Sequence, residues 1–303
     1  MKHIRLFFIF LFAVPAFAQS TTTQPAATAS DEIVVTASAL PESVETTPAA
    51  ATVITREEIE QRQARDVADV LREVPGVVIS RTGSQGHAAS MFIRGGSSKQ
   101  ALVLWNGIEI NNAYFSAYNL GQLSTAGVEK VEVVRGPYSA LYGSDAVSGV
   151  VNVLTTPARN GATIDVEAGE HGLLNAALSG ALAGSRWNAH GAIERRQDDG
   201  FAANDDFRSL SILGGATFEP FDGASVGVLA RVSDYDLGIP FNVNGTFTNF
   251  VPTLRRREDG RERHLAIPLR YESGSMAYEV RLSEHHRDDH FEDPDAPFGG
   301  EFA

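Results

Sequence analysis

The stretch Val128–Leu154, VEKVEVVRGPYSALYGSDAVSGVVNVL, carries the strongest structural signal in this 303-residue chain. Its two ends, Val128–Val134 and Ser148–Leu154, are rich in β-branched residues and predict extended segments. Between them, Gly136-Pro137 and Tyr142-Gly143 mark places where backbone must pass close to backbone, because glycine permits positive φ and proline fixes φ. The stretch therefore predicts two extended segments separated by a path with glycine and proline at defined points.

The residues before this stretch predict the rest of a small mixed α/β domain over roughly 50–155. Thr55–Glu58 has the pattern of a capping box that opens a helix. One apolar stripe continues that helix to the break at Pro75-Gly76, through Ile59, Val67, Val70, Leu71 and Val74. Further short strands are expected at 51–54, 77–80, 91–94 and 101–105.

After Pro157 the sequence alternates between apolar and small or polar residues. Apolar side chains occupy every second position of 187–193, 224–232 and 278–282. Segments of about ten residues with this alternation are typical of transmembrane barrel strands. A soluble β-sandwich has half-buried strands that alternate in the same way, so periodicity alone leaves both architectures open.

Turn signals in this part of the chain come in two lengths. Tight turns are expected at 183–185 and 221–223, and longer polar loops at 197–206 and 234–262. Short turns at one end and long loops at the other are typical of an outer-membrane barrel.

The first residues predict export. Lys2 and Arg5 precede the apolar run Leu6–Val14, and Ala16-Phe17-Ala18 is a small-x-small cleavage site. Residues 19–30 are small and polar, which indicates a flexible linker. The chain has a formal net charge of −13 and no cysteine, which argues against a nucleic-acid partner and excludes disulfides and thiolate chemistry.

Four motifs, in order along the chain, resemble those of the TonB-dependent outer-membrane receptors. Asp31–Ser38, DEIVVTAS, resembles the TonB box, and Met91–Gly95, MFIRG, resembles the family's IRG motif. Ala101–Ile110, ALVLWNGIEI, resembles its VLxDG strand and turn, with Asn106 where the family usually has aspartate. Val128–Leu154 resembles its most diagnostic block, with the RGP turn, YG and GxVN.

The resemblance implies a mixed α/β plug domain followed by an incomplete antiparallel transmembrane β-barrel, with about seven of about twenty-two strands. The implied segments are an export signal at 1–18, a linker at 19–30, a TonB box at 31–38, a plug domain at 39–157 and a partial β-barrel at 158–303. An open barrel edge is not stable in hydrocarbon, so we expect the chain to be a fragment of a longer transporter.

Within the family the chain is most similar to the vitamin B12 (cobalamin) receptors, through the VPGV turn at 74–77, the 97–110 segment and the DDG loop at 198–200. Matching them places plug contacts to the ligand at Ala88, Ser90, Ser97, Phe115 and Ser116. Ala88 and Ser97 depart from the bulkier or amide-bearing residues of that branch. The aromatic-rich loop 111–119 would suit a siderophore nearly as well.

The family's mechanism implies a TonB energy-coupling protein as partner, which captures residues Asp31, Glu32, Ile33, Val34, Val35, Thr36, Ala37 and Ser38 as an added strand. Arg94, Glu132 and Arg135 are candidate polar contacts between plug and barrel wall. The resemblance also implies Ca²⁺ in the extracellular loops, held by Asp198, Asp199, Asp205, Asp206, Asp234 and Asp236.

The alternatives are a siderophore receptor and a non-transporting, plug-bearing binding module. An exported enzyme is disfavoured because no nucleophile–base pair can be proposed. His87, His171 and His190 are scattered, and His285-His286 is far from any serine in a recognisable motif, so these are expected to be plain surface or lumen histidines.

Overall fold

The computed structural model describes residues 34–35, 42–43, 50–112, 115–156, 160–243, 250–274, 276–294 and 300–302. The expected export signal and linker, and all of the expected TonB box except Val34 and Val35, lie outside these residues. Those two valines form β1 (Val34–Val35), which pairs antiparallel with β2 (Glu42–Ser43). No helix within the described ranges is long and apolar enough to cross a membrane.

The plug domain is built on a five-stranded mixed sheet with the order β3-β8-β9-β6-β7. β6 and β9 are parallel, and the other neighbours are antiparallel. The strands are β3 (Ala50–Thr55), β6 (Ala101–Trp105), β7 (Ile108–Glu109), β8 (Lys130–Arg135) and β9 (Gly149–Leu154), and a separate hairpin pairs β4 (Val77–Arg81) with β5 (Ala89–Ile93). The two strands expected from the first stretch are therefore β8 and β9, and they are direct partners.

The expected single helix is two helices, α1 (Arg56–Gln61) and α2 (Val67–Leu71). The capping box at Thr55 and Glu58 is present as predicted. After α1 the backbone takes a positive φ of 51° at Gln63, and Asp66 caps a new helix by accepting from Asp69 N. The apolar spacing from Ile59 to Val67 fits one continuous helix as well as two, so periodicity could not detect the break. Three short helices complete the plug: η1 (Ser98–Gln100), η2 (Leu120–Gln122) and α3 (Ser139–Tyr142).

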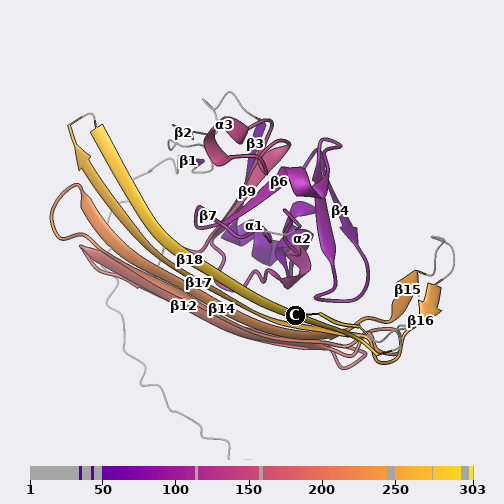
Figure 1. Cartoon of the computed structure of the whole chain (residues 1–303). Coiled ribbons are helices and arrows are strands. Elements are labelled where there is room, and N and C mark those ends of the chain that lie inside the picture. The colour runs from indigo at the N-terminus through magenta and orange to yellow at the C-terminus, as the bar shows by residue number, and fades with distance from the viewer. Residues whose placement is uncertain are drawn as a thin grey trace, which may run out of the picture. The chain divides into compact units, whose positions relative to one another are not determined.

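The second part of the described chain is an eight-stranded antiparallel sheet with the order β10-β11-β12-β13-β14-β17-β18-β19. It curves around one side of the plug (Figure 1). Its strands are β10 (Gly161–Ala168), β11 (Leu174–Ala183), β12 (Trp187–Asp198), β13 (Phe207–Phe218), β14 (Ala224–Gly238), β17 (Arg257–Ser273), β18 (Met276–Asp293) and β19 (Gly300–Phe302). The seven strands expected before residue 293 are confirmed, and the predicted fold class with them.

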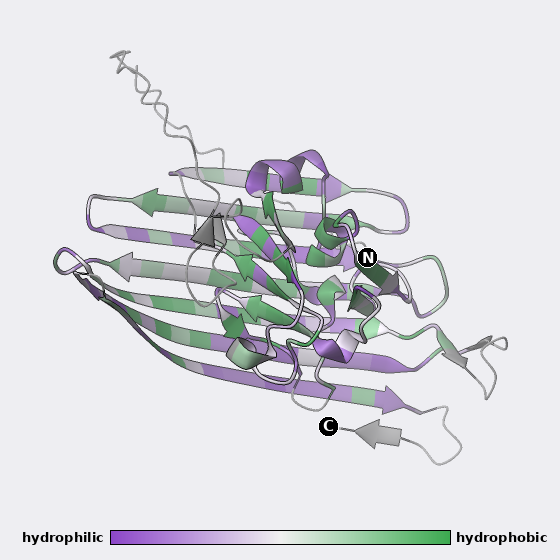
Figure 2. Ribbon diagram, turned by 90° about the horizontal axis from the view of Figure 1, so that it is seen from above, coloured by the Kyte–Doolittle hydropathy of each residue, from purple (hydrophilic) through white to green (hydrophobic). Residues whose placement is uncertain are grey.

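Hydrophobic and hydrophilic residues alternate along the strands of this sheet (Figure 2), and on β14 the alternation separates a buried from an exposed face. On β14, Leu229, Arg231 and Ser233 are buried toward the plug, while Val228 and Val232 are exposed on the opposite face. The same outward face carries large exposed apolar side chains on its other strands, among them Ile164, Val166, Leu178, Leu182, Ile193, Leu210, Ile212, Leu265, Ile267, Leu269, Val280 and Leu282.

Connections at the two ends of the sheet differ in length. At one end, short turns join β11 to β12, β13 to β14 and β17 to β18. At the other end lie the longer connections 199–206 and 239–256, the second of which contains the hairpin β15 (Phe241–Val243) and β16 (Phe250–Pro252). The expected loop 234–262 is thus shorter than predicted, because β14 and β17 pair as far as Gly238 and Arg257.

The eight-stranded sheet, called the wall from here on, contributes to the hydrophobic core of the plug. Val131, Val133, Val151 and Val153 of the plug sheet are fully buried together with Trp105. Leu229 of β14 and Ala266 of β17 belong to the same buried cluster. Plug and sheet are therefore packed against each other by apolar contact as well as by the polar contacts described next.

Candidate functional site at the junction of plug and sheet

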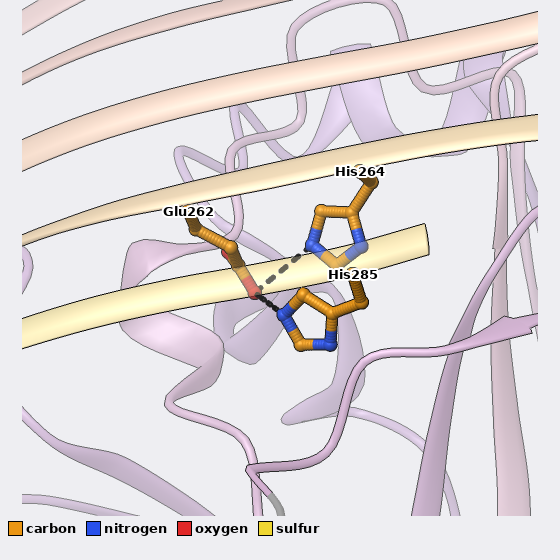
Figure 3. A group of neighbouring side chains, drawn as sticks. All are labelled: Glu262, His264 and His285. Atoms are coloured by element: carbon orange, nitrogen blue, oxygen red, sulfur yellow. Dashed lines mark ion pairs between the residues drawn. The ribbon is translucent and has the colours of Figure 1, made fainter. Parts of the chain in front are cut away.

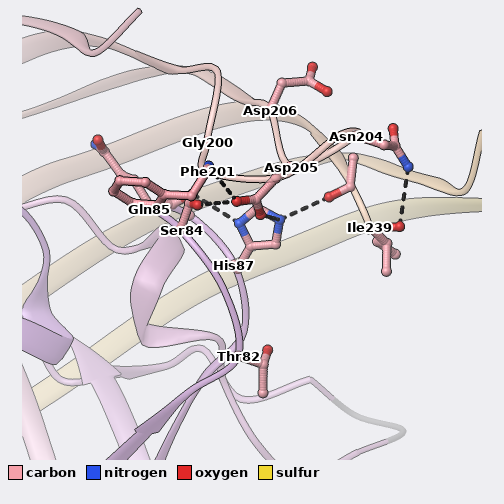
Figure 4. A network of polar contacts seen from close by, with 12 residues as sticks. Thr82, Ser84, Gln85, His87, Gly200, Phe201, Asn204, Asp205, Asp206 and Ile239 are labelled. Atoms are coloured by element: carbon pink, nitrogen blue, oxygen red, sulfur yellow. Dashed lines mark hydrogen bonds and ion pairs between the residues drawn. The ribbon is translucent and has the colours of Figure 1, made fainter. Parts of the chain in front are cut away.

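The plug loop 82–88, which joins β4 to β5, reaches the long-connection end of the sheet (Figure 4). Ser84 Oγ donates to Asp205 Oδ2, and the amide of Phe201 donates to the same oxygen over 2.9 Å. His87 Nε2 donates to the carbonyl of Gly238 over 2.9 Å and lies 3.3 Å from Asp205 Oδ1. Because Ser84, His87 and Asp205 are all buried, these contacts fix the plug loop to the connection 199–206.

Close packing at Gly86 supports this docking. Gly86 has a φ of +79°, and a Cβ there would overlap the ring of Phe207, which is fully buried at the start of β13. Next to it, Gln85 and Asn175 exchange side-chain hydrogen bonds of 3.2 and 3.3 Å between plug and β11. Glycine is therefore required here for both backbone conformation and space.

The five residues predicted to contact ligand fall into two places. Ala88 and Ser90 flank the start of β5 beside the docked loop, whereas Ser97 follows the other end of that strand and caps η1. A five-residue strand is about 17 Å long, so the structure separates Ser97 from Ala88. Asn119 bonds to the backbone on either side of Ala88: its Oδ1 accepts from Ala89 N (2.9 Å) and its Nδ2 donates to Gly86 O (3.3 Å).

Phe115 and Ser116 lie on a tight turn that projects from the plug. Ser116 has a φ of 50°, and its amide donates to Asn112 O over 2.8 Å. Asn111 braces the turn from inside, donating to Ser116 O and to Ala101 O over 3.2 Å each. This scaffold presents the Phe115 ring with 65% of its surface exposed. Asn111 thus holds Ser116 beside Ala101, four residues after Ser97, whereas Ala88 and Ser90 lie at the docked loop.

The six candidate calcium ligands each contact other groups of the chain. Arg257 pairs with Asp206 and with Asp236, and Arg261 pairs with Asp234. Asp205 is engaged by Ser84 and Phe201, Asp198 Oδ1 accepts from Gly200 N, and Asp199 lies against Gly172. All of these carboxylates except that of Asp199 therefore have an arginine, hydroxyl or backbone hydrogen-bond partner.

The arginine pairs order the long connections. The hydrogen bonds from Arg257 hold the pKa of Asp206 below its ordinary value. Asn204, in the left-handed conformation with φ 60°, donates from Nδ2 to the carbonyls of Ile239, Thr253 and Arg256. The connection 199–206 is therefore tied both to the plug loop and to the connection 239–256.

The three candidate plug–wall residues lie on or beside strands of the plug. Glu132 is in the middle of the plug sheet, on β8 between β3 and β9, and pairs with Lys130 over 2.8 Å. Arg135 donates to the carbonyls of Pro75 and Ala51, and Arg94 is exposed beside Gly76. The named partners of Glu132 and Arg135 thus belong to the plug itself, because β8 is a central strand flanked by other plug strands.

Other residues make the polar contacts between plug and wall. Arg65 of the plug pairs with Glu167 of β10, with Nε 2.9 Å from the carboxylate. Arg196 of β12 is almost fully buried and donates to the plug carbonyls of Gly121 (3.2 Å) and Gln122 (3.0 Å). Polar groups of the plug therefore contact the wall through Arg65 and through the carbonyls of Gly121 and Gln122, which lie outside the plug strands.

A further polar cluster connects the plug to the centre of the wall. Tyr118 donates to Glu262 Oε2 over 2.7 Å, and Arg231 Nη1 donates to the same oxygen over 2.7 Å. Burial raises the pKa of the Tyr118 hydroxyl, so it is a donor at neutral pH. His264 and His285 lie against the other carboxylate oxygen of Glu262 (Figure 3).

This cluster was not predicted from the sequence. His285 was expected to be a plain surface or lumen residue, and His87 likewise, yet His87 is buried and His285 stacks on His264 with ring centroids 4.1 Å apart. The alternation along β17 and β18 could have indicated this cluster, because Glu262, His264 and His285 all occupy positions on the inner face of the sheet.

Comparisons with known proteins agree with this architecture. Residues 43–150 match the family model of the TonB-dependent receptor plug domain. The chain is similar to the vitamin B12 transporters BtuB of two Vibrio vulnificus strains: 43% identical over 141 residues in strain CMCP6, covering 46% of this chain and 23% of that protein, and 34% identical over 208 residues in strain YJ016, covering 65% and 34%. The chain thus spans 23% and 34% of the length of these two relatives.

A solved structure shows the same fold. The ferripyoverdine receptor of the outer membrane of Pseudomonas aeruginosa superposes with a TM-score of 0.70 at 20% identity, over 86% of this chain and 37% of that one. The packing of a plug against a curved antiparallel sheet is therefore shared with that structure.

Proposed function

This chain carries the plug domain of the TonB-dependent receptors, and we propose that it acts as the plug and wall of an outer-membrane receptor for energy-coupled uptake of a large ligand. The ligand that fits best is cobalamin or a related corrinoid. No bond of the ligand is made or broken in this function.

The outward face of the sheet supports placement in the outer membrane. Its apolar band is bordered at the short-turn end by aromatic side chains, in the cross-strand pairs Trp187 with Phe218 and Tyr271 with Tyr278. Aromatic residues border the apolar band of outer-membrane barrels at the lipid–water interface. The short turns would then lie on the periplasmic side.

Strand length supports the same orientation. About 9–11 residues of a tilted strand cross a bilayer, whereas β17 has 17 residues and β18 has 18. Toward the long-connection end, the outward positions of these strands become charged, with Arg261 and Arg263 on β17 and Asp288 on β18. These ends would project beyond the lipid into the external medium.

The observation that carries the proposal is the common location of plug loops and long connections. The loop 82–88 is bound to the connection 199–206, and Asn119 of the segment 115–119 bonds to Ala89 N and Gly86 O beside it. The exposed Phe115 ring and the hydroxyls of Ser90 and Ser116 offer stacking and hydrogen bonding to a large ligand of mixed polarity. Similarity to vitamin B12 transporters favours a corrinoid.

Energy coupling is proposed to act through residues 31–38. Within them, Val34–Val35 is already extended and paired with Glu42–Ser43. A TonB-type coupler would replace this local partner by adding its own strand.

Binding of cyanocobalamin to the chain in outer-membrane vesicles tests the proposal. Phe115→Ala should weaken binding by about tenfold, because a stacked aromatic contact and its buried area are lost. Phe221→Ala is the matched control, since Phe221 is similarly exposed but lies at the short-turn end. Equal binding by all three proteins, or no binding by any, would overturn the corrinoid proposal.

A ferric siderophore receptor is the second candidate, favoured by the aromatic Phe115 turn, which suits a chelate as well as a corrin. Vesicles that bind a ferric siderophore in a Phe115-dependent way, and are not competed by cyanocobalamin, would establish this alternative.

A further inference from the structure

We propose that Glu262, His264 and His285 form a binding site for one divalent transition-metal ion, with Zn²⁺ as the best fit, on the inner face of the wall (Figure 3). Two residues come from β17 and one from β18. The proposal does not depend on the identity of the transported ligand.

The donor atoms have the spacing of a metal site. Glu262 Oε1 lies 3.0 Å from His264 Nε2 and 3.2 Å from His285 Nε2, and all three ligand atoms lie within 4.8 Å of one another. Donors at zinc–ligand distances of 2.0–2.1 Å in a tetrahedron are separated by about 3.3 Å. A single ion could therefore be reached by all three with small side-chain adjustments.

The same atoms lack hydrogen-bond partners. Glu262 Oε1, His264 Nε2 and His285 Nε2 are buried and form no hydrogen bond with good geometry, although they approach one another closely. The side chains of His264 and Glu262 are 0% and 5% exposed. Buried polar atoms without partners are costly, and a bound cation would satisfy three of them at once.

The surroundings orient the carboxylate. Arg231 and Tyr118 both donate to Glu262 Oε2, which leaves Oε1 directed at the two imidazoles. Hydrogen-bond donors of this kind fix the orientation of the residues that bind a metal ion. The positive charge of Arg231 lowers the affinity for any cation, so we expect binding that is weaker than in a structural zinc site with four protein ligands.

The donor set selects the class of metal. Two imidazole nitrogens and one carboxylate suit Zn²⁺ and its first-row neighbours. Ca²⁺ prefers six to eight oxygens, which this site does not offer, so it is distinct from the calcium expected in the external connections. An occupied site would link β17 to β18 and, through Glu262 and Tyr118, to the plug.

Zn²⁺ titration of the untagged, chelator-treated full chain in detergent micelles tests the proposal by calorimetry. We expect one Zn²⁺ per chain. His264→Ala and His285→Ala should each weaken binding by at least about 100-fold, more than the loss typical of an outer-shell change. His286→Ala is the matched control, because His286 is the neighbouring residue on the outward phase of β18 and should leave binding unchanged.

A second measurement guards against misfolding of the variants. Co²⁺ bound to the wild-type chain should give visible ligand-field bands, and X-ray absorption should show two imidazole ligands. His285→Gln, at a partly exposed position, should abolish this signal while the migration of the unheated protein in SDS gels stays unchanged. Absence of stoichiometric Zn²⁺ in the wild-type chain, or equal affinity of the His285 and His286 variants, would overturn the proposal.

Discussion

Tyr118 of the plug and Glu262 of β17 are 144 residues apart in sequence and share a hydrogen bond of 2.7 Å. Arg231 of β14 donates to the same carboxylate oxygen. One buried carboxylate of the wall therefore receives a plug residue and a wall residue together. This shared acceptor fixes the position of Tyr118, and with it the segment 115–119, relative to the centre of the sheet.

Replacing Tyr118 by phenylalanine should destabilise the docked plug by about 1.5–3 kcal/mol, the usual contribution of a hydrogen bond to a charged group. Chemical denaturation in detergent micelles measures the change. Tyr278→Phe is the control, because Tyr278 is exposed on the outward face and its hydroxyl contacts only Met276 Sδ among the contacts described. Equal losses in both variants would show that the bond to Glu262 does not hold the plug.

Gly86→Ala should release the loop 82–88 from the wall. The new Cβ would overlap the Phe207 ring in addition to adopting an unfavourable positive φ. Gly95→Ala separates the two effects, since Gly95 has a nearly identical φ of +78° and nothing within 4 Å of the added Cβ. The control should cost about 1–2 kcal/mol from backbone strain alone. Hydrogen exchange should increase in 82–88 only for Gly86→Ala, and the same exchange in both variants would contradict the docking.

Val34→Pro should abolish energy-coupled uptake while leaving ligand binding intact. Proline has no amide hydrogen and cannot complete the ladder that an added coupler strand requires. Val34→Leu retains the amide and should transport normally. Uptake of labelled ligand by cells, beside binding by isolated outer membranes, measures both properties. Transport by the proline variant would rule out strand addition at this residue.

Calcium at the acidic connections stays a prediction, and its arginine competitors provide a test. Arg257→Gln frees Asp206 and Asp236, and should tighten Ca²⁺ binding by about tenfold because a nearby positive charge is removed. Arg186→Gln frees Asp222 at the opposite end and should have no effect. Calorimetry with Ca²⁺ decides: if neither the wild-type chain nor Arg257→Gln binds the ion, the prediction is wrong.

Local patterns predicted the elements well. The strands β8 and β9, the capping box at Thr55 and the alternation on β12, β14 and β18 all appear where expected. Each of these features depends on residues that are only a few positions apart, so it can be predicted from the local sequence. The prediction of a single helix is wrong at Gln63, where the backbone φ is positive. The spacing of apolar residues carries no information about the backbone conformation at this polar position.

Contacts between distant segments could not be predicted from local patterns. Arg257 and Arg261 come from β17 to Asp206, Asp234 and Asp236. Each of these pairs is at least 21 residues apart in sequence, so no local pattern records it.

By itself, the sequence determined that a mixed α/β plug precedes a run of antiparallel strands with one apolar face. These features follow from nearest-neighbour chemistry: β-branched runs, glycine turns and period-two alternation. Only the tertiary structure decided which polar residues meet. Glu262, His264 and His285 become a cluster because β17 and β18 pair in one register, and a shift of one residue would turn His285 to the outer face.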